Sequence, residues 1–183
     1  MNKTEVRLRR AYFDTRFGQL HVRTAFPGTG GFDEHTTLFC VHAAAVGSSS
    51  RDFAGLLGLL AADRSVYAPD RPGYGESDEG GARDVSSHAL ALADLAADLR
   101  LRRIDLLGAQ EGAGVAAALA AAQPQLVRRV VLLAQDAALR GAAVAQPVLR
   151  VRLGGEGAEF AADACTADPQ GLARAVRGFL DRP

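Results

Sequence analysis

Gly108-Ala109-Gln110-Glu111-Gly112 is the stretch that decides how this chain folds. It has the frame G-x-S-x-G, in which a serine sits on a sharp turn between a strand and a helix, but glutamine takes the place of the serine. A mostly apolar run, Ile104–Leu107, precedes the stretch, and an alanine-rich segment follows it as far as Ala122. The pattern therefore predicts a strand, a tight turn at Gln110 and a helix. Because a carboxamide cannot attack a carbonyl group, the turn also argues against covalent catalysis.

Length and composition predict one globular domain, residues 1–183, that is large enough to bury a core. Lys plus Arg and Asp plus Glu both number 21, and no long run of one sign occurs, so we expect no binding to nucleic acid or to an anionic membrane. The first residues lack the apolar core of a secretory signal, and no stretch approaches the roughly 18 apolar residues of a membrane span. We therefore expect a cytoplasmic protein.

Patterns typical of strands and of helices alternate along most of the chain. Strands are expected at 11–15 and 20–24, which form a hairpin around Gly18, and at 37–41, 65–68, 104–107, 130–133 and 148–153. Apolar residues at helical spacing predict helices after Ser50, over 88–99, over 112–122 and after Asp168-Pro169. This alternation predicts a doubly wound α/β fold with a mostly parallel sheet of about 7–8 strands and an N-terminal hairpin.

Two further expectations concern the second half of the chain. About a dozen residues separate the last two parallel strands, which leaves room for one short helix between them. After the final strand, Gly154–Gly157 is typical of a tight turn, and we expect 158–161 to return as an antiparallel edge strand.

Four segments, taken in order, resemble the α/β-hydrolase superfamily over most of the chain. They are Gly18–His21 in the hairpin, the strand that ends at Val41-His42, the loop Asp70–Asp78 with the sequence DRPGYGESD, and the turn at Gln110. The resemblance implies the fold of that superfamily, with a nucleophile on the turn, an acid after a later strand and a histidine in the loop before the last helix. Such a turn is called a nucleophile elbow.

The sequence departs from this pattern at two of the three catalytic positions. Gln110 replaces the nucleophile, and the loop that should carry the catalytic histidine contains none. The four histidines all lie upstream of the elbow, at His21, His35, His42 and His88. Asp136 or Glu156 remains as a candidate for the acid. The cap that the superfamily inserts between its late strands is also missing, so we expect a shallow or open pocket.

Three residues are candidates for chemistry at the elbow. Gln110 would offer a donor and an acceptor to the pocket. Glu111 is either a general acid or base or a first-turn carboxylate that interacts with the helix dipole. His42 is either a proton carrier or a structural histidine bonded to nearby backbone. The sequence leaves both pairs of alternatives open.

The resemblance also implies an oxyanion hole, a pair of backbone N–H groups that would belong to Ala44 and Glu111. Ala43 stands where the superfamily usually has glycine. We expect Ala43, Ala44, Ser48 and Asp136 to contribute to ligand binding. Cys40 and Cys165 have neither the spacing of a disulfide framework nor that of a metal site, and we expect no metal and no cofactor.

These observations favour a non-hydrolytic protein of this fold, which binds a small molecule or a partner in the residual pocket or at a dimer surface. The alternative is a cofactor-independent lyase, isomerase or cyclase that acts on a small carbonyl or polyketide-like compound through Gln110, Glu111 or His42. A third hypothesis is hydrolysis by another nucleophile, such as Ser48 or Cys40. The chain lacks helices that the superfamily usually has, which would leave sheet surface and a sheet edge uncovered. We therefore expect a homodimer.

Overall fold

A computed structural model of the protein describes residues 6–28, 35–81, 84–135, 144–155, 158–160 and 163–183. The strands are β1 (Arg7–Thr15), β2 (Gly18–Phe26), β3 (Leu38–Val41), β4 (Val66–Pro69), β5 (Ile104–Ala109), β6 (Val127–Ala134) and β7 (Val148–Arg152). The helices are the 3₁₀ helix η1 (Ser50–Phe53), α1 (Ala54–Leu60), α2 (Val85–Asp98), α3 (Gly112–Ala122), α5 (Ala164–Ala167) and α6 (Pro169–Leu180).

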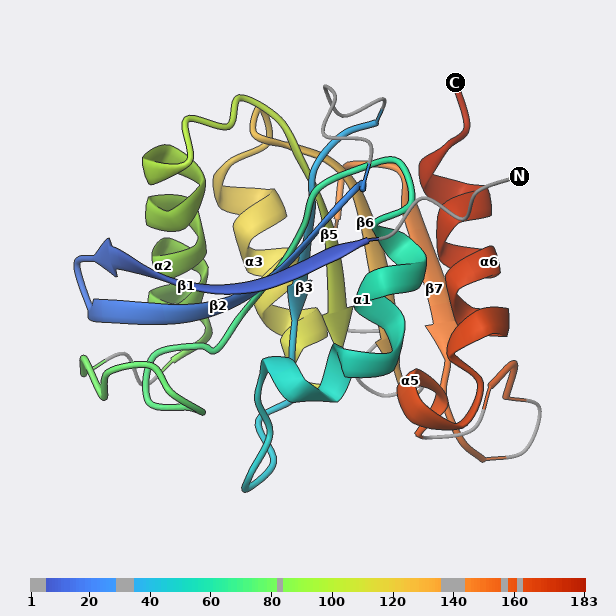
Figure 1. Ribbon diagram of the computed structural model, residues 1–183, viewed down its shortest axis with the longest axis horizontal. Helices are drawn as coiled ribbons and strands as arrows, with labels where there is room; N and C mark the ends of the chain where they lie inside the picture. Colours follow the sequence, from blue (N-terminus) through green and yellow to red (C-terminus); the bar gives the residue numbers. More distant parts are fainter. Residues whose placement is uncertain (1–5, 29–34, 82–83, 136–143, 156–157, 161–162) are drawn as a thin grey trace.

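The strands form one seven-stranded sheet in the order β1-β2-β4-β3-β5-β6-β7. The hairpin β1–β2 is antiparallel, and β2 joins β4 in antiparallel fashion. All other neighbours are parallel, so the carboxyl ends of β3, β4 and β5 lie at one edge of the sheet. Figure 1 shows the hairpin, coloured blue, crossing in front of the central strands. The expected mostly parallel sheet with an N-terminal hairpin is confirmed.

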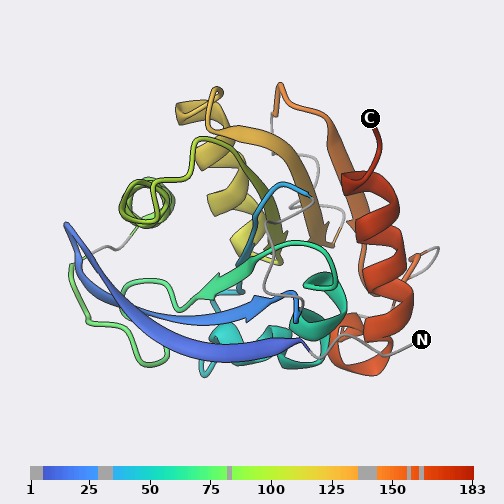
Figure 2. The ribbon, with the colours of Figure 1, turned by 45° about the horizontal axis from the view of Figure 1, so that its top comes forward.

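Helices cover both faces of the sheet. Figure 2 shows α2 and α3 on one face and α1 and α6 on the other. Each face has its own apolar core, with Leu92 and Leu106 in the first and Phe53 and Leu107 in the second. Every residue of β3, β4 and β5 is buried, as a parallel sheet between two helical layers requires. Because the central strands are buried, the elbow at the carboxyl end of β5 stands on a rigid part of the sheet.

Polar residues set where the helices begin. Asp84 caps α2 by accepting from the backbone N–H of Ser87 at 2.7 Å. The expected start of α6 is confirmed, because Asp168 accepts from the N–H of Gly171 at 2.9 Å. The first helical segment differs from expectation, since Ser49 is the cap and Ser50 already belongs to η1.

The segment after β7 also differs from expectation. Phe160 makes a single isolated parallel bridge to Leu153, so the antiparallel edge strand expected at 158–161 is wrong for its described residues. Two backbone hydrogen bonds make this bridge, from the N–H of Phe160 to the carbonyl of Arg152 and from the N–H of Gly154 to the carbonyl of Phe160. The short helix expected between β6 and β7 would fall largely on 136–143, which lie outside the described residues. Among the described helices, none has the length and apolar character needed to cross a bilayer.

Candidate functional site

Gln110 lies at the turn between β5 and α3, where the sequence places it. Its φ is +51°, in the left-handed region that residues other than glycine rarely adopt. The backbone N–H of Gln110 donates to the carbonyl of Leu133 at 2.7 Å, and its own carbonyl accepts from Ala113 at 3.0 Å. These bonds fix the turn to β6 on one side and to the first turn of α3 on the other. The side chain at the nucleophile position is a half-buried carboxamide.

The two glycines of the motif are required by close approach. A Cβ added to Gly108 would lie 2.5 Å from the carbonyl oxygen of Gly112, and one added to Gly112 would lie 2.3 Å from that of Val41. Both distances are far below van der Waals contact. The frame of the elbow is therefore kept for steric reasons even though its nucleophile is absent.

The carboxylate of Glu111 occupies one position of the oxyanion hole that the resemblance implies. Its Oε2 accepts from the backbone N–H of Ala44 at 3.1 Å. This N–H and that of Glu111 itself hold the pKa of the carboxyl below its ordinary value, and the charge of Arg71 adds to the effect. The N–H groups that would stabilise an oxyanion in a hydrolase thus already have an internal anion as their partner.

His42 follows β3 and is fully buried. Its Nδ1 lies 2.7 Å from the carbonyl of Ala43, and its Nε2 accepts from the N–H of Arg71 at 3.0 Å. Burial and, to a smaller extent, the charge of Arg71 together lower the pKa of the imidazole to about 4. With a carbonyl on Nδ1 and an amide N–H on Nε2, the ring is a neutral imidazole held by backbone on both sides.

Tyr74, Arg71 and His88 form a column of aromatic and cationic side chains next to His42. The ring of Tyr74 lies 5.2 Å from that of His42 and 6.0 Å from that of His88, which comes from α2. The guanidinium of Arg71 lies 4.4 Å from the centre of the Tyr74 ring and donates to the carbonyl of Ala43 at 2.6 Å. The column joins the loop after β3 to the loop after β4.

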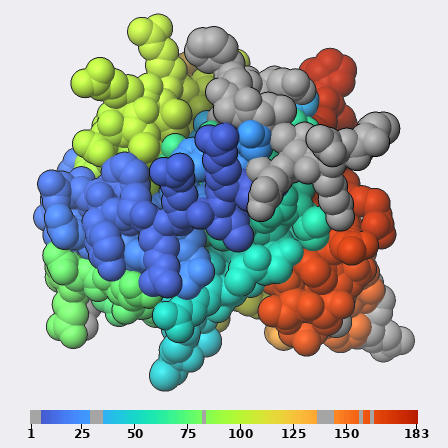
Figure 3. Space-filling view, in the orientation of Figure 1, coloured from blue at the N-terminus to red at the C-terminus, as the bar shows by residue number. Residues whose placement is uncertain are grey.

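These two loops enclose a cleft of about 640 Å³. It is lined by 44–49 and 73–76 together with Arg51 and Asp70. Ala44 belongs both to the wall of this cleft and to the oxyanion hole. In Figure 3 the loop after β3 projects from the lower edge of the molecule, and Val46 within that loop is fully exposed. A volume of this size suits a small organic molecule.

No sequence pattern predicted the buried pair between His21 and Asp70. Nδ1 of His21 lies 2.8 Å from Oδ2 of Asp70, and both side chains are almost completely buried. Burial by itself would raise the pKa of Asp70, but hydrogen bonds from Glu76, Ser50 and His21 outweigh it and hold the pKa below its ordinary value. The pair links β2 to the loop after β4, and only the pairing of these distant segments brings the two residues together.

Among the described residues, the two other candidate nucleophiles, Ser48 and Cys40, are hydrogen-bonded or buried. Ser48 lines the cleft, but its hydroxyl hydrogen-bonds to Asp52. Cys40 is fully buried in β3, and burial raises the pKa of its thiol, which opposes formation of a thiolate. Asp136 and Glu156, the two candidate acids, lie outside the described residues.

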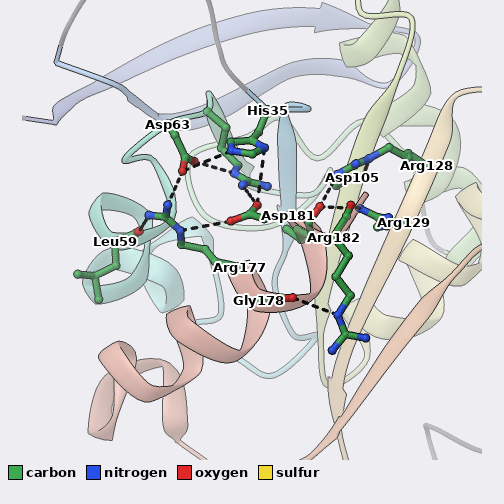
Figure 4. A network of polar contacts seen from close by, with 12 residues as sticks. His35, Leu59, Asp63, Asp105, Arg128, Arg129, Arg177, Gly178, Asp181 and Arg182 are labelled. Atoms are coloured by element: carbon green, nitrogen blue, oxygen red, sulfur yellow. Dashed lines mark hydrogen bonds and ion pairs between the residues drawn. The ribbon is translucent and has the colours of Figure 1, made fainter.

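A cluster of charged side chains lies at the opposite end of the sheet. Figure 4 shows His35 between Asp63 and Asp181, with its ring nitrogens 3.8 Å and 3.9 Å from their carboxylates. The three side chains are close enough together to share a metal ion. However, Arg177 pairs with Asp63 and Arg64 pairs with Asp181, so the carboxylates are already neutralised. The cluster is an ion-pair network that holds the end of α6.

Comparison with known proteins adds a family and a fold. Residues 38–183 match the model of the alpha/beta hydrolase family. An uncharacterised protein of Mycobacterium tuberculosis is 36% identical over 88 residues, which are 48% of this chain and 26% of the relative. Pyrrolizixenacetamide deacetylase of Xenorhabdus hominickii is 39% identical over 88 residues, which are 33% of its length. The alignments thus span about a third or less of these curated relatives.

Solved structures confirm the architecture over almost the whole chain. A protein of Thermoplasma acidophilum described as a predicted CIB-like hydrolase has a TM-score of 0.77 at 18% identity, with 96% of this chain and 99% of that chain covered. Cfl2 of Burkholderia cenocepacia has a TM-score of 0.59 at 28% identity and covers 69% of this chain and 41% of that chain.

Proposed function

Because this chain belongs to the alpha/beta hydrolase family, we propose that it is a non-hydrolytic member that binds a small molecule in the cleft between the loops after β3 and β4. One observation carries the proposal. At the elbow, a carboxamide stands at the nucleophile position, and the neighbouring Glu111 carboxylate takes the N–H of Ala44. The cleft next to Ala44 offers the ligand a space of about 640 Å³.

Covalent hydrolysis needs a hydroxyl or thiol, a base and an empty oxyanion hole. The chain has no histidine after His88, so no imidazole can come from the late loop that normally supplies it. The one ring lone pair of neutral His42, on Nε2, already accepts from the N–H of Arg71, and a pKa of about 4 makes the imidazole a weak base at neutral pH. A filled hole and a neutral, engaged imidazole both favour binding over turnover.

The alternative of a lyase, isomerase or cyclase finds less support in this geometry. A general acid or base works best with a pKa near the working pH. The pKa of Glu111 lies below its ordinary value and that of His42 is about 4, so neither group is tuned for proton transfer near neutrality.

Labelling with a fluorophosphonate probe tests the absence of hydrolysis. We expect no labelling of the native protein, of Gln110→Ala or of Gln110→Ser, because the introduced serine would have no base beside it. The matched Ala and Ser variants separate the effect of the new hydroxyl from that of the lost amide. Labelling of the native protein, or esterase turnover that an elbow substitution abolishes, would contradict the proposal.

Nuclear magnetic resonance with a library of small fragments tests the binding. Fragments that enter the cleft should shift the backbone amides of 44–49 and 73–76. Arg51→Gln and Glu76→Gln should weaken these shifts, because both side chains line the cleft, whereas Arg102→Gln on the exposed end of the α2–β5 connection should leave them unchanged. If no fragment shifts the amides of the cleft, this part of the proposal fails.

A further inference from the structure

A second hollow, of about 560 Å³, lies at the opposite end of the sheet from the elbow. Its lining comes from β1, β2 and the start of β4, and includes Arg7, Arg9, Phe26, Ser65 and Tyr67. Ser65 precedes β4, so the hollow opens at the amino ends of the parallel strands. The elbow stands at the carboxyl end of β5. The two sites are therefore separated by the length of the sheet.

Strand register explains why these residues share one face. Arg7 pairs with Phe26 and Arg9 with Thr24, while Thr24 in turn pairs with Tyr67 of β4. Paired residues project to the same face of a sheet, and residues two apart along a strand do so as well. The register thus sets the two arginines of the edge strand beside an aromatic floor.

The floor is rigid and apolar. The rings of Phe26 and Tyr67 meet edge to face, with centres 5.8 Å apart, and Tyr67 also contacts Phe39 at 5.7 Å. Thr24 and Tyr67 are buried in the sheet, so their positions depend on the core rather than on a loop. Flat apolar groups stack well on such rings.

The rim carries unneutralised positive charge. Arg7 and Arg9 are exposed, and among the described residues neither has a carboxylate within ion-pair distance. A third arginine of the rim, Arg10, shares its charge with Glu76 at 3.6 Å. Among the described residues of the lining, none is acidic. Guanidinium groups bind carboxylates, sulfonates and phosphates through paired N–H donors.

We propose that this hollow is a binding site for a small anion with a flat, apolar body, such as an aryl carboxylate, sulfonate or phosphate. Arg7 and Arg9 bind the anionic group, and Phe26 and Tyr67 contact the body. The volume matches that of ligand pockets in general. The chain has no net charge and no long basic run, so the local charge complements a small ligand rather than a nucleic acid.

The full chain and 1-anilinonaphthalene-8-sulfonate, an aryl sulfonate whose fluorescence rises in apolar surroundings, test this site. We expect saturable binding that weakens about ten-fold in Arg7→Gln/Arg9→Gln, since each charge-assisted bond contributes substantially to affinity. Arg102→Gln removes an exposed arginine that lines neither hollow and should keep native affinity. The neutral analogue N-phenyl-1-naphthylamine should bind at least about ten-fold more weakly than the sulfonate.

Native affinity in the double variant, or an equal loss in Arg102→Gln, would overturn the assignment. Both arginines are exposed on an edge strand, so the variants should fold, and unchanged thermal unfolding confirms that dye binding reports on the native protein. Because the site lies far from the elbow, the test stands apart from that of the proposed function.

Discussion

At the scale of the residue, Gln110 combines an inert side chain with a backbone conformation that favours glycine. The left-handed region costs a residue with a Cβ roughly 1–2 kcal/mol, and glycine avoids that cost. We predict that Gln110→Gly raises the free energy of unfolding by up to about 1 kcal/mol, after the greater entropy of glycine in the unfolded chain is subtracted.

The matched control is Gln123→Gly. Gln123 ends α3 with φ near −130°, where glycine gains nothing, so this substitution should lower stability. Urea denaturation of both variants measures the difference. A loss of stability in Gln110→Gly equal to that in Gln123→Gly would show that the elbow stores no strain at this residue.

The second prediction at this scale concerns pH. The pKa of His42 is about 4 when folded, against an ordinary value of 6.5, so between these values the unfolded chain binds a proton that the folded protein excludes. The stability from His42 is therefore complete above pH 6.5 and is lost as the pH falls toward 4. The loss reaches about 3 kcal/mol. Lowering of the pKa of His88 acts in the same direction.

Unfolding free energies measured from pH 7 to pH 4 check this prediction. In His42→Gln the amide can still donate to the carbonyl of Ala43, but it does not titrate, so stability should fall less steeply with decreasing pH than in the native protein. If the unfolding free energies of the two proteins depend on pH in the same way, the pKa of His42 is the same in the folded and unfolded states.

Sequence alone could place Gln110 but not the partners of the residues around it. The turn was predictable because its motif lies within five consecutive residues, where Gly108 approaches the backbone of Gly112. The bond from Ala44 to Glu111 depends on a side-chain rotamer and on two residues that are 67 positions apart in the sequence. The pair of His21 and Asp70 likewise depends on how the hairpin meets the parallel sheet.

At the scale of the element, the predictable parts were those with strong periodicity or buried runs. β3 and β5 are short, apolar and bounded by loops, and the apolar stripe of α6 follows a capping Asp168. The return strand expected at 158–161 failed because a glycine-rich turn says nothing about the direction of the chain that leaves it. An isolated bridge at Phe160 satisfies that segment with two backbone bonds.

The end of α6 gives a prediction about an element. Arg128 from β6 makes two hydrogen bonds, of 2.9 Å and 2.6 Å, to the fully buried carboxylate of Asp105, and donates to the carbonyl of Leu180 at 2.8 Å (Figure 4). Arg128→Ala would leave the buried carboxylate of Asp105 without its hydrogen-bond partner, whereas Arg129 would still donate to the carbonyl of Leu180 at 2.7 Å. We predict a loss of about 3–5 kcal/mol in unfolding free energy.

Chemical denaturation checks the size of this loss, with Arg102→Ala as the control on an exposed arginine that should change stability by less than about 0.5 kcal/mol. Asp105→Asn added to Arg128→Ala removes the unpaired charge and should restore part of the stability. If the double variant is no more stable than Arg128→Ala, the cost comes from lost packing and not from the carboxylate.

At the scale of the whole molecule, the Thermoplasma acidophilum protein shares the fold over 96% of this chain and 99% of its own. The sheet ends at β1, and there Leu8 and Tyr12 are 62% and 54% exposed on one face. An exposed edge strand of nine residues is a template for pairing.

We propose that two copies associate through this edge, and its charges set how the association responds to salt. Antiparallel pairing of β1 with its copy would bring Arg7, Arg9 and Arg10 of both chains onto one shared sheet, so like charges oppose the dimer. Salt screens that repulsion, and raising NaCl from ~0.05 M to ~0.5 M should strengthen dimerisation. Leu8→Lys should give monomers, whereas Leu90→Lys on α2 should not. Sedimentation velocity measures both effects, and a dimer that dissociates with added salt, or survives Leu8→Lys, must use another surface.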